Sequence, residues 1–157
     1  MNGVSKISIV EDVALVTFHK VPNDPKLLST IFTGLANVKV NLDMISQTAP
    51  QGHYIDISFT LLANQLVEVL GLVNKFCENH ADFKPMVSNG NCKIQLYGEE
   101  MREMYGVAAA AITAVADANA ELTLISTGEV EISLLVPQAC CNEAVGALEK
   151  AFQVKAD

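Results

Sequence analysis

The sequence has little positive charge. Its 157 residues include ten lysines and arginines against eighteen aspartates and glutamates, which gives a formal net charge of −8 at pH 7. Arg102 is the single arginine. Proteins that bind nucleic acid neutralise phosphates with clustered basic side chains, so the composition argues against nucleic acid as a partner. It argues equally against phosphoryl transfer, in which cationic groups stabilise the transferred phosphate.

Long apolar segments are also missing. The longest, residues 107–112, is mostly alanine and is much shorter than the roughly 18 residues of a membrane span, so we expect no membrane partner. The first residues do not combine positive charge with an apolar stretch, which argues against a secretion signal and predicts a cytoplasmic protein. Hydrophobic residues nevertheless make up 50% of the chain, enough for one domain or two small intertwined ones.

Patterns typical of metal sites and disulfides are absent as well. No C-x-x-C spacing occurs among the cysteines, which are Cys77, Cys92, Cys140 and Cys141. The histidines are isolated from one another, at positions His19, His53 and His80. Zinc sites need regularly spaced ligands, and cytoplasmic thiols stay reduced. We therefore expect no metal, no cofactor, and cysteines that pack as small hydrophobic side chains.

Strand and helix patterns alternate along the chain. Alternating or β-branched segments predict strands at 5–10, 13–18, 38–46, 54–61, 83–88, 92–97, 121–126 and 130–136. Apolar residues at helical spacing predict helices at 27–35, 66–77, 106–118 and 142–152. Asp24 can cap the first of these helices, and Pro25 suits its first position because its missing N–H group is not needed there.

The order of these elements repeats. Residues 13–90 read β-α-β-β-α-β, and residues 92–152 repeat the first five elements, with matching segments 75 to 80 residues apart. The second copy lacks its last strand, whereas an extra strand at 5–10 precedes the first copy. We therefore expect the N-terminal strand to complete the second sheet, so that a first module (13–90) is inserted into a second (1–12 plus 91–157). Weak pairing by the last five residues is the alternative.

Four segments resemble the paired ACT domains that regulate aspartokinase. They are N-x-D-M-I-S-Q at 41–47, D-I-S-F at 56–59, G-x-x-M-R followed by G-V-A-A within 98–109, and L-I-S-T-x-E-x-x-I-S at 124–133. The resemblance covers nearly the whole chain. It implies an α+β fold of two ferredoxin-like βαββαβ (ACT) modules, with antiparallel sheets that carry helices on one face and the first module inserted into the second.

The resemblance also implies a regulatory rather than catalytic chain. The phosphate-binding pattern G-x-x-x-x-G-K-[ST] is missing, and nothing in the sequence resembles the kinase domain of aspartokinase. We expect no kinase activity from this chain. It is either a piece of a longer enzyme or a separate regulatory subunit.

In the family, effector amino acids bind at the loop before the first helix of a module and at the strand that follows, usually where ACT domains of two chains meet. The N–H groups of a helix N-terminus attract a carboxylate, and an acidic or amide side chain can hold an ammonium group. By resemblance, the candidate effector-binding residues are Asn23, Asp24, Pro25, Lys26, Leu27, Leu28, Asp43, Met44, Gln47, Gly106, Val107, Glu121 and Leu122.

Several of these positions depart from the family pattern. Asn23 replaces the usual aspartate, and Lys26 replaces a glycine whose missing Cβ would let a ligand approach closely. In the second module, Tyr105 replaces the usual proline, and Glu121 replaces a common asparagine and favours a cationic ligand. Each candidate also has a structural interpretation. Asp24 can simply start a helix, Asp43 can be a solvated strand residue, and Gln47 can form a hydrogen bond between subunits.

The leading hypothesis is an allosteric amino-acid sensor that binds lysine, or as second choice threonine, at a homodimer interface and acts on a kinase domain in the same chain or on a catalytic subunit. A dimer is expected because a sheet with helices on one face leaves its other face and edges in need of cover. The alternative is an ACT dimerisation scaffold without a ligand. A small independent enzyme is disfavoured, since no nucleophile, histidine and acid form a recognisable set.

Overall fold

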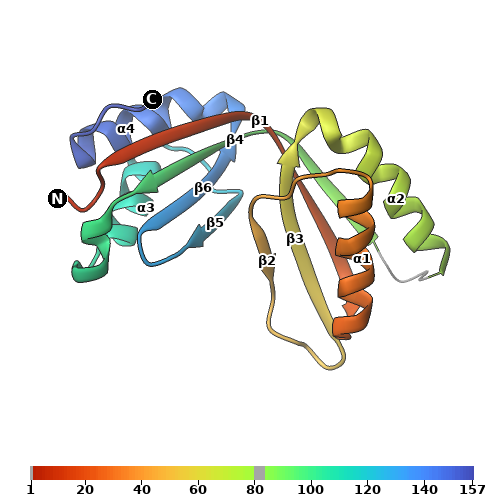
Figure 1. Ribbon diagram of the computed structural model, residues 1–157. Coiled ribbons are helices and arrows are strands. Elements are labelled where there is room, and N and C mark those ends of the chain that lie inside the picture. Colours follow the sequence, from red (N-terminus) through yellow and green to blue (C-terminus); the bar gives the residue numbers. More distant parts are fainter. Residues whose placement is uncertain (1, 80–83) are drawn as a thin grey trace. The chain divides into compact units, whose positions relative to one another are not determined.

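The computed structural model describes residues 2–79 and 84–157, and the chain forms two compact units. The central unit is Val13–Asn89, and the split unit combines Met1–Asp12 with Gly90–Asp157. Two long strands, β1 (Lys6–Pro22) and β4 (Lys84–Tyr97), contribute to both units (Figure 1). His80 and the first residue of the strand predicted at 83–88 lie outside the described residues.

The continuity of β1 and β4 corrects the prediction of two short strands in each place. The expected breaks, between residues 10 and 13 and at Asn89-Gly90, are not chain reversals. Asp12 and Gly90 do have positive φ angles, of 56° and 70°, but extended backbone continues on both sides of them. An Asn-Gly pair favours a turn. Here strand pairing on both sides outweighs that local preference, and the left-handed residue remains a local irregularity.

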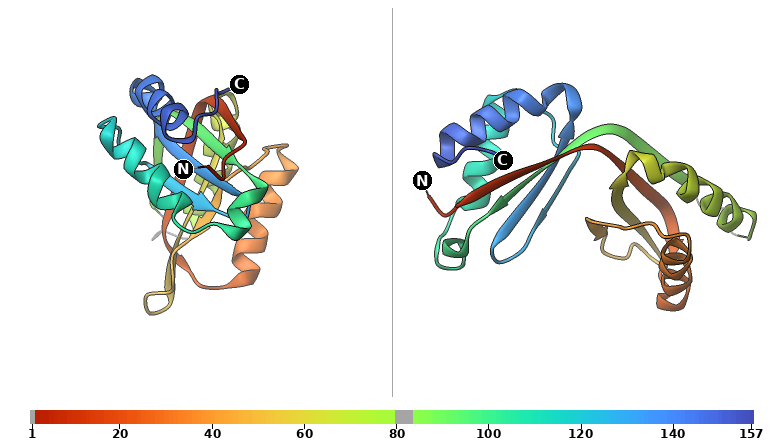
Figure 2. Two further views of the ribbon diagram at one scale, coloured as in Figure 1. Left: turned by 90° about the vertical axis from the view of Figure 1, so that its left-hand side faces the viewer. Right: turned by 45° about the horizontal axis from the view of Figure 1, so that its top comes forward.

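In the central unit the strand order is β2-β3-β1-β4. The remaining elements of the unit are α1 (Pro25–Asn37), β2 (Ile45–Gln47), β3 (Tyr54–Leu62), a 3-10 turn (Ala63–Gln65) and α2 (Leu66–Asn79). β3 lies between β1 and β2 and is antiparallel to both. Both helices cover one face of the sheet (Figures 1 and 2). Alternate residues of β3 face these helices, which places Asp56 and Ser58 on the opposite face.

Aromatic rings form the centre of this unit's core. Phe59 is fully buried and makes edge-to-face contacts with Phe18 and Phe32, with ring centroids 5.7 and 6.0 Å apart. The helices contribute Ile31, Leu35, Val69 and Val73. The apolar stripes predicted for the two helices are therefore confirmed as the buried faces, except that Leu70 of the second stripe is exposed.

β2 is much shorter than the strand predicted at 38–46. Lys39 has a φ angle of 60°, so the chain leaves α1 through a left-handed residue rather than directly into a strand. Thr60 then anchors the next residues, because its carbonyl accepts from the Asp43 N–H group (3.1 Å) and its hydroxyl accepts from the Met44 N–H group (2.9 Å). A side-chain acceptor thus replaces part of the regular ladder, and regular pairing begins only at Ile45.

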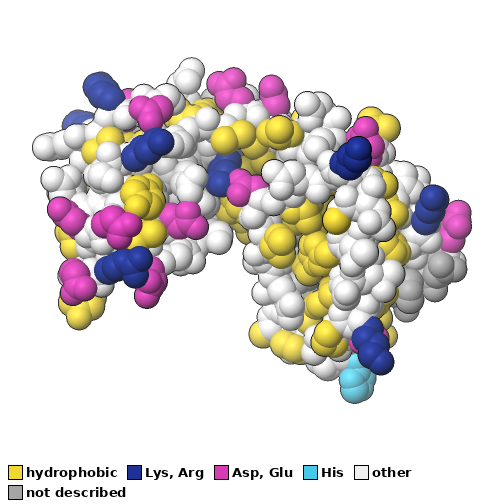
Figure 3. All heavy atoms as spheres, viewed as in Figure 1, with side chains coloured by type: hydrophobic (Ala, Val, Ile, Leu, Met, Phe, Trp, Pro, Cys, Tyr) yellow, Lys and Arg dark blue, Asp and Glu magenta, His cyan; other side chains and the backbone are white. Residues whose placement is uncertain are grey.

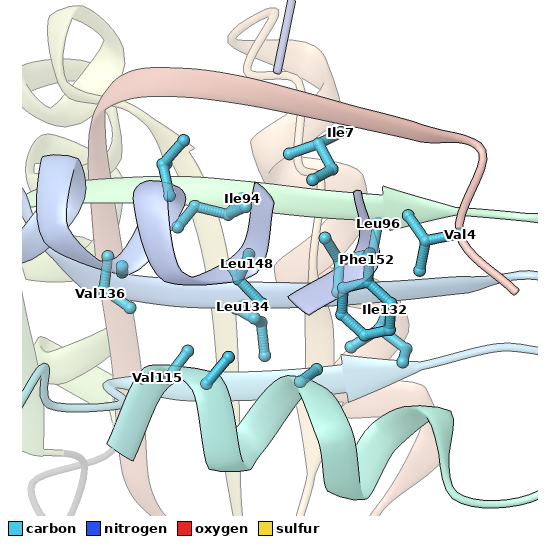
Figure 4. Packing of buried hydrophobic residues seen from close by; sticks show 14 of the residues in the cluster. Val4, Ile7, Ile94, Leu96, Val115, Ile132, Leu134, Val136, Leu148 and Phe152 are labelled. Carbon is cyan, nitrogen blue, oxygen red and sulfur yellow. The ribbon is translucent and has the colours of Figure 1, made fainter. Parts of the chain in front are cut away.

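In the split unit the strand order is β1-β4-β6-β5. The remaining elements are a 3-10 helix (Glu99–Glu103), α3 (Val107–Asp117), β5 (Leu124–Thr127), β6 (Glu131–Pro137), a 3-10 turn (Gln138–Cys140) and α4 (Cys141–Phe152). β5 begins later than the predicted strand at 121–126. Leu134, Leu148 and Phe152 are fully buried between the sheet and the two helices (Figure 4).

Both ends of the chain pair within the split unit. The Ser5 N–H group donates to the Tyr97 carbonyl (2.7 Å), beside the first residues of β1. On the other side of β1, the Asp157 N–H group donates to the Ile7 carbonyl (3.0 Å), and Ala156 forms an isolated parallel bridge with Ile7. The N-terminal strand therefore completes this sheet, and the C-terminal residues pair weakly as well. The expected α+β fold, with antiparallel sheets and helices on one face, is confirmed.

Candidate functional site

The start of α1 is a capped helix N-terminus. β1 ends at Pro22, and the Asn23 N–H group donates to the His53 carbonyl (2.8 Å), which ties this short loop to the β2–β3 connection. Asp24 caps the helix, because its Oδ1 accepts from the Lys26 N–H group at 3.0 Å. Pro25 occupies the first helical turn. The helix start predicted from Asp24 and Pro25 is therefore confirmed.

Few N–H groups remain free at this helix end. Pro25 has none, the Lys26 N–H group is used by Asp24, and the Leu28 N–H group donates to the Asp24 carbonyl at 3.1 Å. Within residues 2–79 and 84–157, the Leu27 N–H group has no hydrogen-bond acceptor. An incoming carboxylate would therefore find one unpaired amide here together with the positive end of the helix dipole.

The segment from Asp43 to Gln47 presents alternate side chains to solvent. Met44 is buried, whereas Asp43, Ile45 and Gln47 are exposed. Gln47 pairs with Ile57 of β3, and β2 is the outermost strand on this side of the order. The edge of β2 that faces away from β3 has no strand partner in the described part of the chain. An acidic and an amide side chain thus share one exposed row on an open sheet edge.

The candidates of the second module lie in the other unit. Gly106 precedes α3 in a left-handed conformation (φ 84°) without a side-chain cap, and Val107 is buried at the first helical position. Glu121 is exposed and Leu122 half-buried in the segment before β5. The candidate residues therefore fall into two groups. Those from Asn23 to Gln47 belong to the central unit, and those from Gly106 to Leu122 belong to the split unit.

An exposed polar network surrounds the 3-10 helix of the split unit, where acidic and basic side chains gather (Figure 3). The Tyr97 hydroxyl donates to Glu99 Oε1 at 2.6 Å, and Arg102 forms ion pairs with Glu99 and Glu129. The hydrogen bond from Tyr97, and then Arg102, lower the pKa of Glu99. The bond to Glu99 and its negative charge raise the pKa of Tyr97. Glu99 and Glu129 are thus engaged in ion pairs at the surface.

The cysteines add no reactive group to these sites. None of the four cysteines forms a disulfide bond; Cys92 and Cys141 are buried, and Cys77 and Cys140 are half-buried. Burial, together with a hydrogen bond to Cys141, raises the pKa of the Cys92 thiol far above its usual range, which makes it unreactive.

Among the described residues, no three histidine, cysteine or acidic side chains are placed to hold a metal ion. No described helix is long and apolar enough to cross a membrane.

Sequence reasoning missed a polar cavity in the central unit. Its volume is about 250 Å³, and it is lined by His19, Lys20, Thr48, Gln51, Tyr54, Ile55 and Asp56. The local sequence does not indicate this cavity, because His19 and Asp56 are far apart in the sequence and meet only through the pairing of β1 with β3. The alternation in β3 was the one available hint, since it places Asp56 on the face opposite the helices.

The ACT domain family matches residues 94–152 of the chain. The chain is 29% identical over 153 residues to aspartokinases from Bacillus sp. (strain MGA3) and Helicobacter pylori (strain ATCC 700392 / 26695). Each alignment covers 96% of the chain, which spans 37% of the length of these relatives. The ACT match and these alignments confirm the predicted resemblance to the regulatory, non-catalytic region of aspartokinase.

Solved structures agree with this aspartokinase-type assignment. An aspartate kinase from Synechocystis superposes with a TM-score of 0.92 and 28% identity, covering 99% of this chain and 28% of that one. A structure of aspartokinase alpha and beta subunits superposes with a TM-score of 0.84 and 25% identity, covering 96% of this chain and 99% of that one. The ligand-free regulatory subunit of aspartate kinase from Thermus thermophilus, at 24% identity, has the same fold with a TM-score of 0.87.

Proposed function

We propose that this regulatory region is an allosteric amino-acid sensor whose effector site lies in the central unit. The carrying observation is the unpaired Leu27 N–H group at the start of α1, in the same unit as the exposed row of Asp43 and Gln47. The helix N-terminus suits the effector's carboxylate, and the Asp43 carboxylate with the Gln47 amide suits its ammonium group. Lysine is the first choice of effector and threonine the second.

The split unit is proposed as the weaker of the two candidate sites. α3 has no proline and no side-chain cap, so more of its first N–H groups need acceptors. However, Val107 is buried against the N-terminal segment, where its side chain lies within 3.2 Å of the Cβ position at Gly3. The unit's own residues thus pack against this helix start. Glu121 supplies an exposed negative charge that would favour a cationic effector.

A homodimer formed through the edge of β2 would place two effector sites side by side. Ile45 lies on this outermost strand with 53% of its surface exposed, between Asp43 and Gln47. Exposed strand edges and apolar side chains favour association with another chain. An effector bound where two chains meet would stabilise one arrangement of the dimer. That preference is what couples the effector to an attached kinase domain or a catalytic subunit.

The test is calorimetric titration of the full chain with each proteinogenic amino acid. Saturable heat with lysine or threonine supports the sensor. At 100 times its Kd, such a ligand also adds about 2.7 kcal/mol of stability, or roughly 5–11 °C of melting temperature for a chain of this size. Asp43→Asn should weaken binding by about tenfold or more, because it removes the charge that pairs with the ammonium group. Glu100→Gln, an exposed acid in the split unit, is the matched control and should leave Kd unchanged.

A second candidate function is a dimerisation scaffold without an effector. Lys26 and Asn23 favour it, since the helix start carries bulk and positive charge in place of a glycine and an acid. In that case every amino acid gives no heat, while light scattering still shows twice the chain mass of 16.8 kDa. A monomer without heat at micromolar concentration would contradict both functions.

A further inference from the structure

A polar cavity of about 250 Å³ opens at one end of β1 and β3 in the central unit. None of its lining residues belongs to the proposed effector site. Its size corresponds to several water molecules or a small metabolite, and lies below the usual range for drug-sized ligands. The cavity is therefore suited to a compact ligand, and its chemistry follows from the polar groups that line it.

The base of the cavity is fixed by an irregularity in β1. Pairing with β3 shifts register between Phe18 and Val21, and Lys20 has a φ angle of 58°. Oδ1 of Asp56 accepts from the Lys20 N–H group (3.2 Å) and contacts Nδ1 of His19 (2.7 Å). Thr48 adds two bonds, because its hydroxyl accepts from the Asp56 N–H group (2.9 Å) and its own N–H group donates to the Asp56 carbonyl (2.9 Å). Asp56 is therefore a structural acceptor that holds His19, Lys20 and Thr48 in place.

Three donors around the cavity remain unused. In the described part of the chain, the Lys20 ammonium, the Gln51 side-chain amide and the Tyr54 hydroxyl have neither a hydrogen-bond nor an ion-pair partner. Gln51 and Tyr54 are joined only through their backbones, which exchange N–H to carbonyl bonds of 2.9 and 3.2 Å. That backbone pairing fixes the two residues side by side on the lining. The unused groups thus comprise one cation and two neutral donors.

The split unit has no basic side chain at the positions equivalent to His19 and Lys20. The positions that the repeat places opposite His19 and Lys20 are Tyr97 and Gly98, and β4 pairs Tyr97 with Glu131. There Glu131 accepts from the Gln95 side chain (2.6 Å), and the Tyr97 hydroxyl already donates to Glu99. The fold therefore does not require a basic side chain at this position, and Lys20 is a local feature of the central unit.

We propose that this cavity binds the anionic oxygen group of a small molecule, a carboxylate or a phosphate, through Lys20, Gln51 and Tyr54. Lysine supplies the charge and the two neutral groups supply additional donors, which together suit an oxyanion. The His19–Asp56 pair positions the bulge rather than binding the ligand, because the bonds to Asp56 fix Lys20 in its left-handed conformation. The site shares no residue with the proposed effector site and does not depend on the proposed function.

The experiment titrates the full chain with sodium acetate, sodium phosphate and, for ionic strength, sodium chloride, followed by backbone amide NMR. Saturable shifts at residues 19–20 and 48–56 with acetate or phosphate, but not chloride, support the site. A response to acetate alone identifies a carboxylate ligand, and a response to phosphate alone identifies a phosphate ligand. Shifts that equal those with chloride, or no saturation with either anion, would overturn the proposal.

A matched pair of variants tests the role of Lys20. Lys20→Gly removes the ammonium but keeps a residue that adopts positive φ readily. Lys39→Gly is the control, because Lys39 is another exposed lysine of the same unit with a φ angle of 60° and lies outside the cavity. Lys20→Gly should weaken anion binding by about tenfold or more, Tyr54→Phe by a smaller factor, and Lys39→Gly not at all. Equal Kd values for Lys20→Gly and Lys39→Gly would contradict the proposal, and Asp43→Asn should leave anion binding intact.

Discussion

The two units share one order of elements but differ in how the first helix begins. In the central unit, β1 ends at Pro22 and α1 starts at Pro25, with an aspartate cap. In the split unit, a 3-10 helix separates β4 from α3, and Gly106 precedes α3 without a side-chain cap. The same scaffold thus carries two different loops. Because the sheets and cores are alike, the difference in binding capacity is expected to lie in these loops.

The contrast extends to what occupies each loop region. In the split unit, the N-terminal segment packs against the loop, and Arg102 links the 3-10 helix to Glu129. In the central unit, the Leu27 N–H group has no acceptor among the described residues, and the polar cavity is lined by the unpaired side chains of Lys20, Gln51 and Tyr54. The repeat thus preserved the fold in both units, whereas the loop before the first helix and its contacts differ between them.

The two cores should respond alike, and this is where the largest effects are expected. Phe59→Ala in the central unit and Phe152→Ala in the split unit each remove a fully buried ring. Each should lower the free energy of unfolding by about 3–5 kcal/mol, because burial is lost and a cavity remains. Urea denaturation measures both. If the free energy of unfolding falls by less than about 1 kcal/mol in one variant, the two cores do not contribute equally to stability.

The close approach of two glycines should make the split unit uniquely sensitive. A Cβ on Gly98 would lie 1.6 Å from the Gly3 carbonyl oxygen, so the N-terminal segment must move. Gly98→Ala should lower the free energy of unfolding by about 3 kcal/mol. Gly71→Ala, in α2 of the central unit, is the control, since its Cβ meets nothing within 4 Å and should stabilise the helix by up to about 1 kcal/mol. Equal melting temperatures would refute the predicted contact.

The aspartate cap should matter only at the first helix of the central unit. Asp24→Ala removes the acceptor of the Lys26 N–H group and should lower the free energy of unfolding by about 1 kcal/mol, whereas Asp24→Asn keeps an acceptor and should cost less. Thermal melting of the three proteins checks this. If Asp24→Ala melts like the parent, the capping bond contributes nothing, and the Asp24 carboxylate is free to take part in ligand binding.

The smallest expected effects concern the pKa values of Tyr97 and Glu99 in the polar network of the split unit. The pKa of Glu99 is lowered by the Tyr97 hydroxyl and by Arg102. Its stabilising contribution is therefore present above the ordinary pKa of a glutamate and is lost as the pH falls through the lowered value. The pKa of Tyr97 is raised by Glu99. The stabilising contribution of this tyrosine is therefore present below the ordinary tyrosine pKa and is lost as the pH rises through the raised value.

Carboxyl NMR titration measures this network. Tyr97→Phe removes the hydroxyl and should move the pKa of Glu99 up towards its ordinary value. Tyr105→Phe, which removes the hydroxyl of an exposed tyrosine beside the same 3-10 helix, is the control and should leave the titration of Glu99 unchanged. A Glu99 titration that is identical in both variants would show that the Tyr97 bond is not formed in solution.

The sequence predicts the scaffold well because periodic burial determines it. Asp24 and Pro25 locate the start of α1, and the apolar stripes of α1, α2 and α4 identify their buried faces. The strand boundaries were less predictable. Asp12 and Gly90 interrupt the local pattern, but pairing with neighbouring strands continues through them. Pairing between strands that are distant in the sequence cannot be predicted from a local sequence pattern.

The candidate site could be predicted only in part. Motif resemblance locates Asn23 to Leu28 and Asp43 to Gln47, but it cannot show that Asp24 is engaged as a cap or that Leu27 keeps an unpaired N–H group. The cavity beside Lys20 could not be predicted at all, because it depends on a bulge in β1 and on a contact between His19 and Asp56. The choice of effector and the homodimer stay predictions.

The most direct test is an amide NMR titration of the full chain with lysine and with threonine. We expect saturable shifts with one of them at residues 23–28 and 43–47 of the central unit, and small or no shifts at 106–107 and 121–122 of the split unit. Saturable shifts confined to the split unit, or none anywhere with either amino acid, would contradict the claim that the central unit carries the effector site.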